Sequence, residues 1–280
     1  MGTWSCYATP GPPASARPAG KQHQQQQDDE EVRSQMPTVP TAEPRSRPPQ
    51  VTAGSILGVW GHPDDETWLS AIHMARAVRA GQRVTCVTAT RGEQGSPDPE
   101  RWPPGEPLAK LRTEELDAAL ALLGVSEHLW LDYPDGSCAD VPLVEGAQRV
   151  LTQLVRTTPD TVLTFGPDGM TGHPDHQSVS RWVDAALARY DGPPPMVLHA
   201  TNTPEWLQRW RPTMDGLGVY MGAEPPVHAR HELRSYLLLT PEETDLKVRA
   251  LLCQASQVGP LIHAFGQDLF RTAMSEESFR

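Results

Sequence analysis

From Ser55 onward, short apolar runs alternate with longer stretches whose apolar residues recur every three or four positions, and this alternation limits the fold most. Short apolar runs are typical of buried strands, whereas three- and four-residue spacing is typical of helices that bury one face. Regular alternation of the two favours βαβ units. The sequence therefore predicts an α/β fold with a mostly parallel sheet flanked by helices.

Five strands and four helices are predicted in this part of the chain. The strands are Ile56–Trp60, Arg83–Ala89, His128–Leu131, Thr161–Phe165 and Met196–Ala200. The helices are Glu66–Ala80, Pro107–Leu123, Leu143–Arg156 and Asp175–Tyr190. Gly81 and Gly124 follow two of the helices, as expected of residues that end a helix.

The alternation weakens after about residue 200. A strand is predicted at Ser235–Leu239 and a helix at Pro241–Gln257, where Thr240 and Glu243 have the spacing of a capping box. Residues 201–235 contain several tryptophans, prolines and glycines, and their sequence leaves open whether they cover the active face or only pack irregularly. The domain is expected to span residues 51–280.

Residues 1–50 differ from the rest because they are rich in proline and glutamine and poor in apolar residues. A segment of this composition cannot bury enough apolar surface to offset its chain entropy, so we expect a disordered tail. Its acidic and basic residues are equal in number. Either the tail is a linker, or translation starts at Met36, or the segment binds a partner; the first two readings are favoured.

Composition excludes several classes of protein. The net charge of −11 does not suit binding to nucleic acid, which depends on clustered Lys and Arg. The four cysteines are too few and too dispersed for a disulfide framework or a CxxC site. No segment reads as a secretory signal or a membrane helix, so we expect a soluble cytoplasmic protein with no membrane partner. Whether it forms a homo-oligomer is left open.

A first polar cluster, Gly61 to Glu66 (Gly-His-Pro-Asp-Asp-Glu), directly follows the first predicted strand. In a parallel sheet, catalytic and ligand-binding groups gather at the carboxyl ends of strands. His62 and Asp65 offer the nitrogen and oxygen ligands that Zn²⁺ accepts. Asp64 then remains available as a general base.

A second cluster, Gly172 to His176 (Gly-His-Pro-Asp-His), follows the fourth predicted strand. It can supply one metal ligand, one acid or oxyanion stabiliser, and one residue that orients this stabiliser. His62, Asp65 and His176 together make a three-ligand zinc site with an open position, which is typical of catalytic zinc. Either motif alone is more often a helix cap or a loop tip, but two at strand-to-helix turns of one sheet favour a metal site.

The two motifs, His62-Pro-Asp-Asp-Glu66 and His173-Pro-Asp-His176, resemble the signatures of the PIG-L/LmbE-like family of zinc-dependent N-acetylglucosaminyl deacetylases. The resemblance extends to Thr90–Gly95, to the helix around Arg112, and to Lys247 with Ser256-Gln257. It covers about residues 55–257.

This resemblance implies a Rossmann-like hydrolase that removes an N-acetyl group from an amino sugar or a related small molecule. It implies Asp64 as general base, and His173 as acid or electrostatic stabiliser, oriented by Asp175. Arg112 resembles a residue that contacts substrate hydroxyls in the family. From the residues alone, a surface ion pair of Arg112 with Glu114 or Glu115 is an equal alternative.

Three departures from the family pattern bear on the substrate. The chain has Trp68-Leu69-Ser70-Ala71 where the family often has two glycines, and Thr171 where some members have a tyrosine. Gln254 stands where the family often has a histidine. The alternatives to a deacetylase are therefore a metal-dependent hydrolase of another amide or of an ester, and a binding module of the same fold. His and carboxylate ligands suit several divalent metals, so Fe²⁺ is an alternative to Zn²⁺.

Overall fold

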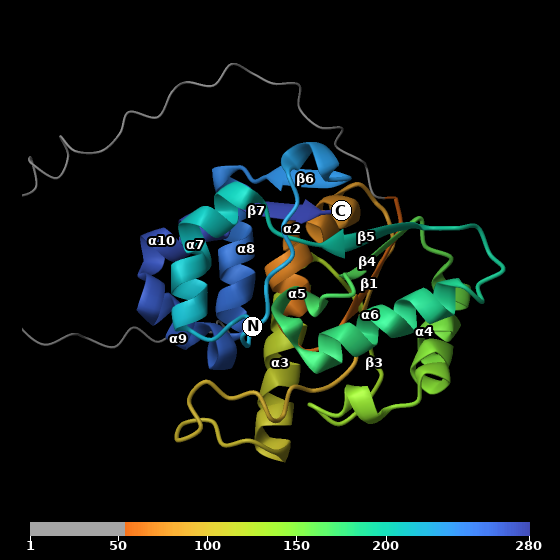
Figure 1. Cartoon of the computed structure of the whole chain (residues 1–280), viewed down its shortest axis with the longest axis horizontal. Helices are drawn as coiled ribbons and strands as arrows, with labels where there is room; N and C mark the ends of the chain where they lie inside the picture. The colour runs from red at the N-terminus through yellow and green to blue at the C-terminus, as the bar shows by residue number, and fades with distance from the viewer. Residues whose placement is uncertain (1–53) are drawn as a thin grey trace, which may run out of the picture. The chain divides into compact units, whose positions relative to one another are not determined.

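The computed structural model describes residues 54–280 (Figure 1). The strands are β1 (Ile56–Trp60), β2 (Val84–Thr88), β3 (Glu127–Trp130), β4 (Thr161–Phe165), β5 (Met196–Ala200), β6 (Ser235–Leu238) and β7 (Glu276–Phe279). The helices are α2 (Asp65–Arg79), α3 (Glu106–Leu123), α4 (Leu143–Thr157), α5 (Gly169–Gly172), α6 (Pro174–Leu187), α7 (Pro204–Gly216), α8 (Pro241–Cys253), α9 (Ala255–Phe265) and α10 (Gln267–Ala273), with short 3-10 turns at Cys138–Asp140 and Arg230–Glu232. The predicted tail, residues 1–50 with Met36 inside it, lies outside the described residues.

The strands form one sheet in the order β3-β2-β1-β4-β5-β7-β6. The neighbours from β3 to β5 are parallel, whereas β7 runs antiparallel to both β5 and β6. Strands β1, β2 and β4 are buried along their whole length, because helices cover both faces of the sheet. The prediction of a Rossmann-like, mostly parallel sheet flanked by helices is confirmed.

The direction of winding reverses between β1 and β4. The chain goes from β1 to β2 on one side and from β4 to β5 on the other, so the loops that follow β1 and β4 diverge. In sheets of this kind, ligands bind in the crevice between two such loops. Both predicted motifs follow these two strands and therefore face one crevice.

Two groups of helices cover the sheet (Figure 1). Helices α4 and α6 pack against each other and against β1, and α6 also contacts β4. Helices α2, α3 and α8 pack together, with α2 against β1, β2 and β7. A second apolar cluster joins α7, α9 and α10 and contains Trp210, Met214 and Phe270. This cluster is built almost entirely from the part of the chain that follows β5.

The ends of the predicted elements differ most in the last third of the chain. The capping box of Thr240 and Glu243 is present at the start of α8. The prediction that this helix continues to Gln257 is wrong beyond Cys253. Helix α8 ends there, Gln254 lies outside both helices, and α9 begins at Ala255. Residues 201–235 contain α7, and α9, α10 and β7 have no counterpart in the prediction.

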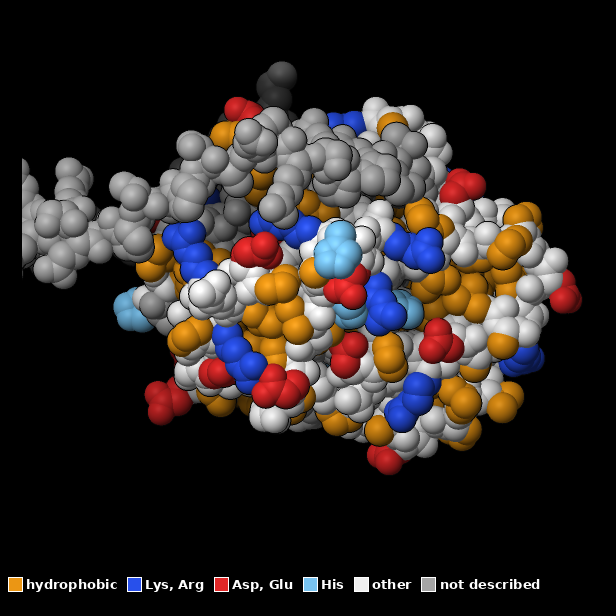
Figure 2. All heavy atoms as spheres, turned by 45° about the horizontal axis from the view of Figure 1, so that its top comes forward, with side chains coloured by type: hydrophobic (Ala, Val, Ile, Leu, Met, Phe, Trp, Pro, Cys, Tyr) orange, Lys and Arg blue, Asp and Glu red, His pale blue; other side chains and the backbone are white. Residues whose placement is uncertain are grey.

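The surface of the described residues carries mixed charge. On the face shown in Figure 2, Lys and Arg side chains lie among acidic and apolar ones rather than in one patch. Within residues 54–280, none of the helices has the length and apolar character needed to cross a lipid bilayer.

Candidate metal centre

The loop after β1 wraps around the carboxylate of Asp65, the first residue of α2. Asp65 Oδ2 accepts hydrogen bonds from the backbone N–H groups of Gly61 (3.1 Å) and His62 (2.8 Å). Gly61 has no side chain, and a Cβ here would lie 2.8 Å from the ring of His176. This glycine therefore allows the β1 loop and the start of α6 to approach each other closely.

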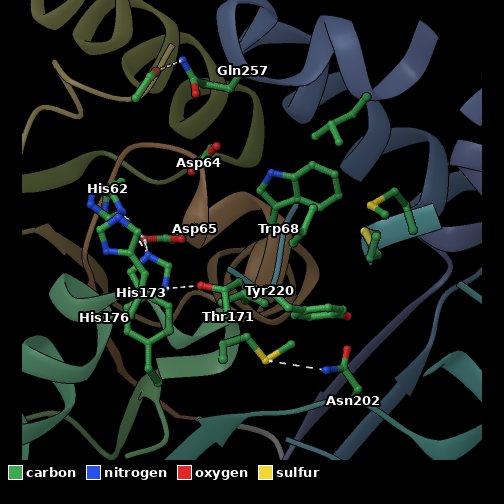
Figure 3. Close-up of a pocket in the computed structure, with 18 of the residues that line it drawn as sticks. His62, Asp64, Asp65, Trp68, Thr171, His173, His176, Asn202, Tyr220 and Gln257 are labelled. Carbon is green, nitrogen blue, oxygen red and sulfur yellow. Dashed lines mark hydrogen bonds and ion pairs between the residues drawn. The ribbon is translucent and has the colours of Figure 1, made fainter. Parts of the chain in front are cut away.

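Three side-chain atoms from the two motifs converge at this point (Figure 3). His62 Nδ1 lies 2.9 Å from His176 Nε2, and Asp65 Oδ2 lies 3.7 Å from the former and 3.4 Å from the latter. Neighbouring ligands of a tetrahedral zinc ion, at about 2.0–2.1 Å from the metal, are about 3.3 Å apart. The spacing of the three atoms fits such an ion, and all three side chains are buried.

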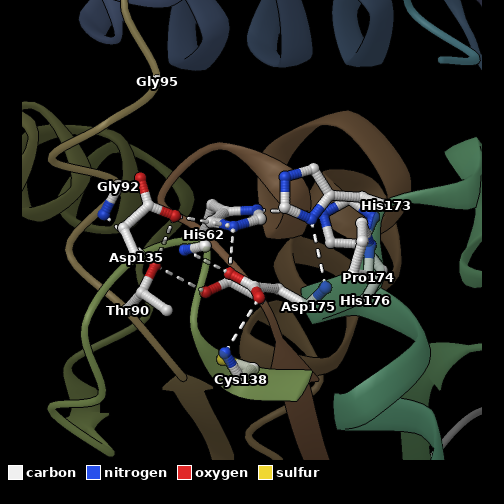
Figure 4. Close-up of polar contacts among 12 residues, drawn as sticks. His62, Thr90, Gly92, Gly95, Asp135, Cys138, His173, Pro174, Asp175 and His176 are labelled. Atoms are coloured by element: carbon white, nitrogen blue, oxygen red, sulfur yellow. Dashed lines mark hydrogen bonds and ion pairs between the residues drawn. The ribbon is translucent and has the colours of Figure 1, made fainter. Parts of the chain in front are cut away.

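The partners of the opposite ring nitrogens orient the two histidines. His62 Nε2 contacts the carboxylates of Asp175 (3.2 Å) and Asp135 (3.1 Å), as Figure 4 shows. His176 Nδ1 faces the carbonyl oxygen of Gly169 at 2.9 Å, and its ring stacks on Phe165. Since these partners only accept hydrogen bonds, each histidine carries a proton on the far nitrogen and directs its other nitrogen towards Asp65.

Two further groupings have ligand atoms within 4.8 Å of one another: His62, His173 and His176, and His62, Asp135 and Asp175. The carboxylates of the second group already accept backbone hydrogen bonds, Asp175 from Gly136 and Cys138, and Asp135 from Gln94. They face the nitrogen of His62 that points away from Asp65. These two carboxylates therefore lie behind His62, where they orient its ring.

The pKa values of these groups follow from burial and close charges. Burial lowers the pKa of His62, but hydrogen bonds to Asp135 and Asp175 and the charge of Asp65 outweigh it and raise the pKa to about 10. Burial lowers the pKa of His176 to about 4. Burial would raise the pKa of Asp135, but the hydrogen bond and the charge of His62 hold it below its usual range.

The structure corrects one expected contact. Asp175 was expected to orient His173, but its buried carboxylate contacts His62, and only its backbone N–H donates to His173 Nδ1 (3.1 Å). His173 thereby caps the start of α6. Because Nδ1 accepts this hydrogen bond, the proton of a neutral His173 lies on Nε2, which is then a donor. Burial, and then the charge of His62, lower the pKa of His173, which favours this neutral form.

Asp64 lies in an unusual backbone conformation next to the three converging side chains. Its φ is 105°, and its N–H donates to Glu66 Oε2 at 3.1 Å. The carboxylate is 3.7 Å from Arg112. Burial, opposed by Arg112 and assisted by the charges of Asp65 and Glu66, raises the pKa of Asp64 to about 8. A carboxyl group in this range can take up and release a proton near neutral pH.

Arg112 is buried, which rules out the surface ion pair considered from the sequence. Its guanidinium donates to the carbonyl oxygens of Pro63 (2.6 Å) and Gly92 (2.8 Å). Glu115 instead accepts hydrogen bonds from Ser256. Arg112 thus joins the loop after β1, through Pro63, to the loop after β2, through Gly92. It also lines the cavity in front of Asp64.

A cavity of about 480 Å³ opens onto these residues (Figure 3). Of the predicted site residues, six line it: His62, Asp64, Asp65, Arg112, His173 and His176. The structure therefore brings the predicted ligands, base and stabiliser together, with Asp175 directly behind; their roles stay predictions.

Asp135 is the residue that sequence reasoning missed. It lies in the loop after β3 and lines the same cavity. The available signal was its place after the third strand of a parallel sheet, at the edge where His62 and His173 also lie. A single Pro-Asp-Gly run is common in turns, and for this reason did not stand out.

Comparisons with known proteins agree with this geometry. Residues 57–187 match the family described as PIG-L: GlcNAc-PI de-N-acetylase. A 1D-myo-inositol 2-acetamido-2-deoxy-alpha-D-glucopyranoside deacetylase 2 from Catenulispora acidiphila is 40% identical over 148 residues, which are 45% of this chain and 49% of the relative. A 1D-myo-inositol 2-acetamido-2-deoxy-alpha-D-glucopyranoside deacetylase from Corynebacterium urealyticum is 28% identical over 243 residues, which are 72% of this chain and 70% of the relative. The chain spans about half the length of the first curated relatives that it matches.

Solved structures share the fold at low sequence identity. An N,N'-diacetylchitobiose deacetylase from Pyrococcus horikoshii has a TM-score of 0.54 and 21% identity, covering 81% of this chain and 83% of that one. A 4-carboxy-2-hydroxymuconate hydratase from Pseudomonas putida has a TM-score of 0.52 and 19% identity, covering 79% and 82%. The fold alone therefore does not define the reaction. The family match and the two motifs do indicate the relationship: residues 57–187 of this chain match the PIG-L family.

Proposed function

We propose that the chain is a zinc-dependent hydrolase that removes the N-acetyl group of an N-acetylglucosamine-type sugar. The observation that carries the proposal is the convergence of His62 Nδ1, Asp65 Oδ2 and His176 Nε2 beside a further carboxylate, Asp64, that lines the same cavity. Relatives that match half of this chain or less are named as deacetylases of an inositol glycoside of N-acetylglucosamine, and this supports the sugar class.

The proposed mechanism assigns one task to each residue. His62, Asp65 and His176 would hold the metal, which when bound supplies a Lewis acid that polarises the amide carbonyl and acidifies water. Asp64 accepts a proton as the water oxygen bonds to the carbonyl carbon, since its raised pKa suits this transfer.

The remaining steps use His173 and the same proton. The Nε2–H of His173 donates a hydrogen bond to the carbonyl oxygen as negative charge develops on it, and this role needs only a neutral imidazole. Asp64 then delivers its proton to the nitrogen as the carbon–nitrogen bond breaks. Acetate and a free amine are the products.

Acetate release from a panel of N-acetylglucosamine glycosides, including the inositol glycoside, tests the proposal. The protein is analysed for bound metal and assayed before and after chelation, and after reloading with Zn²⁺ or Fe²⁺. We expect release that needs the metal and is lost in Asp64→Asn. A metal-loaded protein that releases no acetate, but hydrolyses other amides or esters, would refute the acetyl assignment and leave the metal site standing.

A further inference from the structure

The cavity that reaches the metal centre has two ends of different chemistry (Figure 3). Near Asp64 it is lined by Arg112, whose guanidinium lies 3.7 Å from the Asp64 carboxylate, and Figure 3 shows Gln257 on the same side. Its other end is formed by six large side chains that we call the apolar lobe: Trp68, Trp206, Met214, Tyr220, Leu261 and Met274. A substrate that spans the cavity therefore meets a polar surface at one end and an apolar one at the other.

The apolar lobe is continuous with the metal centre. Trp68 belongs to the first turn of α2, which begins at Asp65, so its ring forms a wall directly beside the ligands. Met170 and Thr171, just before His173, also line the cavity, and Figure 3 shows Thr171 between His176 and Tyr220. A group bound in the lobe can therefore belong to the same small molecule as an amide held at the metal.

Polar residues behind the lobe are engaged with one another. Lys247 Nζ lies 3.1 Å from Glu277, and both are buried.

The neighbouring carboxylate of Glu276 is also engaged. It accepts hydrogen bonds from Thr203 (2.7 Å) and Tyr236 (2.9 Å). These groups are not free to bind the many hydroxyls of a cyclitol. Among residues 54–280, Asn202 Oδ1 accepts no hydrogen bond and the Tyr220 hydroxyl makes none, so this end offers one free amide oxygen and one free hydroxyl.

The lobe also comes from a different part of the chain. Five of its six residues, all but Trp68, follow position 187, where the match to the family ends. The catalytic residues all precede that position. The shape and polarity of the lobe are therefore features of this chain that the family match does not supply.

We propose that the substrate of this chain carries an apolar group, an alkyl chain or an aromatic ring, that fills the apolar lobe while the amide lies at the metal centre. This rests on the proposed function. Water in the apolar lobe finds few hydrogen-bond partners, so its displacement costs little free energy. An apolar ligand also makes van der Waals contacts with the large side chains of the lobe. A cavity of about 480 Å³ is larger than an acetyl group needs and lies in the usual range of small-molecule sites.

Two substrate series test the proposal and locate the apolar group. One series carries methyl to octyl aglycones on N-acetylglucosamine, and the other carries acetyl to octanoyl groups on glucosamine. We expect kcat/KM to rise by about threefold to fourfold per methylene in one series until the lobe is filled. That series identifies the side of the amide that faces the lobe. A flat response in both, or the highest kcat/KM for the inositol glycoside, would overturn the proposal.

A matched pair of variants assigns the effect to the lobe. Leu261→Gln keeps a similar volume and places an amide in the lobe, so it should flatten the dependence on chain length. Leu269→Gln makes the same change on α10 at a half-exposed position outside the cavity, and should leave the dependence intact. Equal slopes in the two variants would contradict the assignment.

Binding separates this proposal from the proposed function. Octyl glucoside has no amide, and its affinity relative to methyl glucoside can be measured by calorimetry on the metal-loaded protein. Tighter binding of the octyl compound that Leu261→Gln removes supports the lobe even if no glycoside is hydrolysed. Equal affinity of the two glucosides overturns the lobe, whatever the activity.

Discussion

The backbone of Asp64 is held in a region that residues with a side chain rarely occupy. Its φ of 105° occurs between β1 and α2, where the chain must turn sharply to bring His62 and Asp65 to one point. Such conformations cost of the order of 1–3 kcal/mol and persist only where neighbouring contacts hold them. Here Glu66 accepts the Asp64 N–H, and Arg112 binds the carbonyl of Pro63.

Two substitutions at Asp64 separate its chemical role from its backbone. Asp64→Asn and Asp64→Gly should both lower kcat by about 10²–10⁴-fold, because the base is lost. The glycine variant should also be more stable by about 1 kcal/mol, since glycine adopts positive φ without strain. Turnover and urea unfolding check the two effects, and metal content is measured in both variants alongside them. Retained turnover in either variant would exclude Asp64 as the base.

Asp175 should influence metal affinity through His62. Asp175→Asn removes the negative charge 3.2 Å from His62 Nε2, and we expect metal affinity to fall by about 10–100-fold. Competition with a chelator of known affinity measures this change. Asp184→Asn, at an exposed position further along α6, is the control and should not alter the affinity. An unchanged affinity in Asp175→Asn would show that Asp175 does not support the ligand.

Helices α4 and α6 approach each other through a glycine. A Cβ at Gly146 in α4 would lie 2.2 Å from the ring of Trp182 in α6, which is fully buried. The close contact depends on the missing side chain. It fixes α6, and therefore the start of α6 where His173 and His176 lie.

This contact predicts opposite effects for two similar substitutions. Alanine favours helices over glycine by about 1 kcal/mol, so Gly259→Ala in α9, which has open space, should stabilise the protein by about 0.5–1 kcal/mol. Gly146→Ala should instead destabilise it by about 1–3 kcal/mol through overpacking. Denaturant unfolding compares the two. A stabilised Gly146→Ala variant would show that α4 and α6 can separate freely.

The bounds of helices and strands were predicted best where the pattern of apolar residues in the sequence matches their burial in the structure. The predicted bounds of β1, β4 and β5 match the structure, because each is a short, largely apolar run with clear ends. The break between α8 and α9 was not predictable, because it depends on distant contacts: Gln254 donates to Glu66 and Thr67.

The missed strand β7 has a related cause. Its sequence, Glu-Glu-Ser-Phe, lacks an apolar run, and Glu277 is buried only because Lys247 and His73 pair with it. At the site, the two motifs identified the converging residues. The contact of Asp175 with His62, and the presence of Asp135, needed the folded loops.

The free energy of unfolding of the whole domain should depend on pH through the ionisation of Glu277. Burial would raise the pKa of this carboxyl, but Lys247 and His73 outweigh it and lower the pKa to about 2, against 4.5 for a free glutamate. Because the pKa is lower in the folded state, the ionised carboxylate stabilises the protein above about pH 4.5. This stabilisation is lost as the pH falls towards 2. The difference corresponds to about 3 kcal/mol in the free energy of unfolding.

Urea unfolding at a series of pH values checks this dependence. Glu277→Gln should be less stable at pH 7, because buried Lys247 loses its partner, and should lose less stability between pH 4.5 and 2. Glu114→Gln, at an exposed position, should follow the parent protein throughout. A Glu277→Gln curve parallel to that of the parent below pH 4.5 would contradict the assignment.

The division of the cavity between two parts of the chain has an evolutionary consequence. The residues that we propose to act on the amide lie between positions 62 and 176, whereas the far wall is built almost entirely after position 200. Mutations in the later segment can therefore change which molecules are accepted without altering the catalytic groups. Selection can then diversify substrate choice while the chemistry is inherited unchanged, and paralogues of this chain should differ most in α7, α9 and α10.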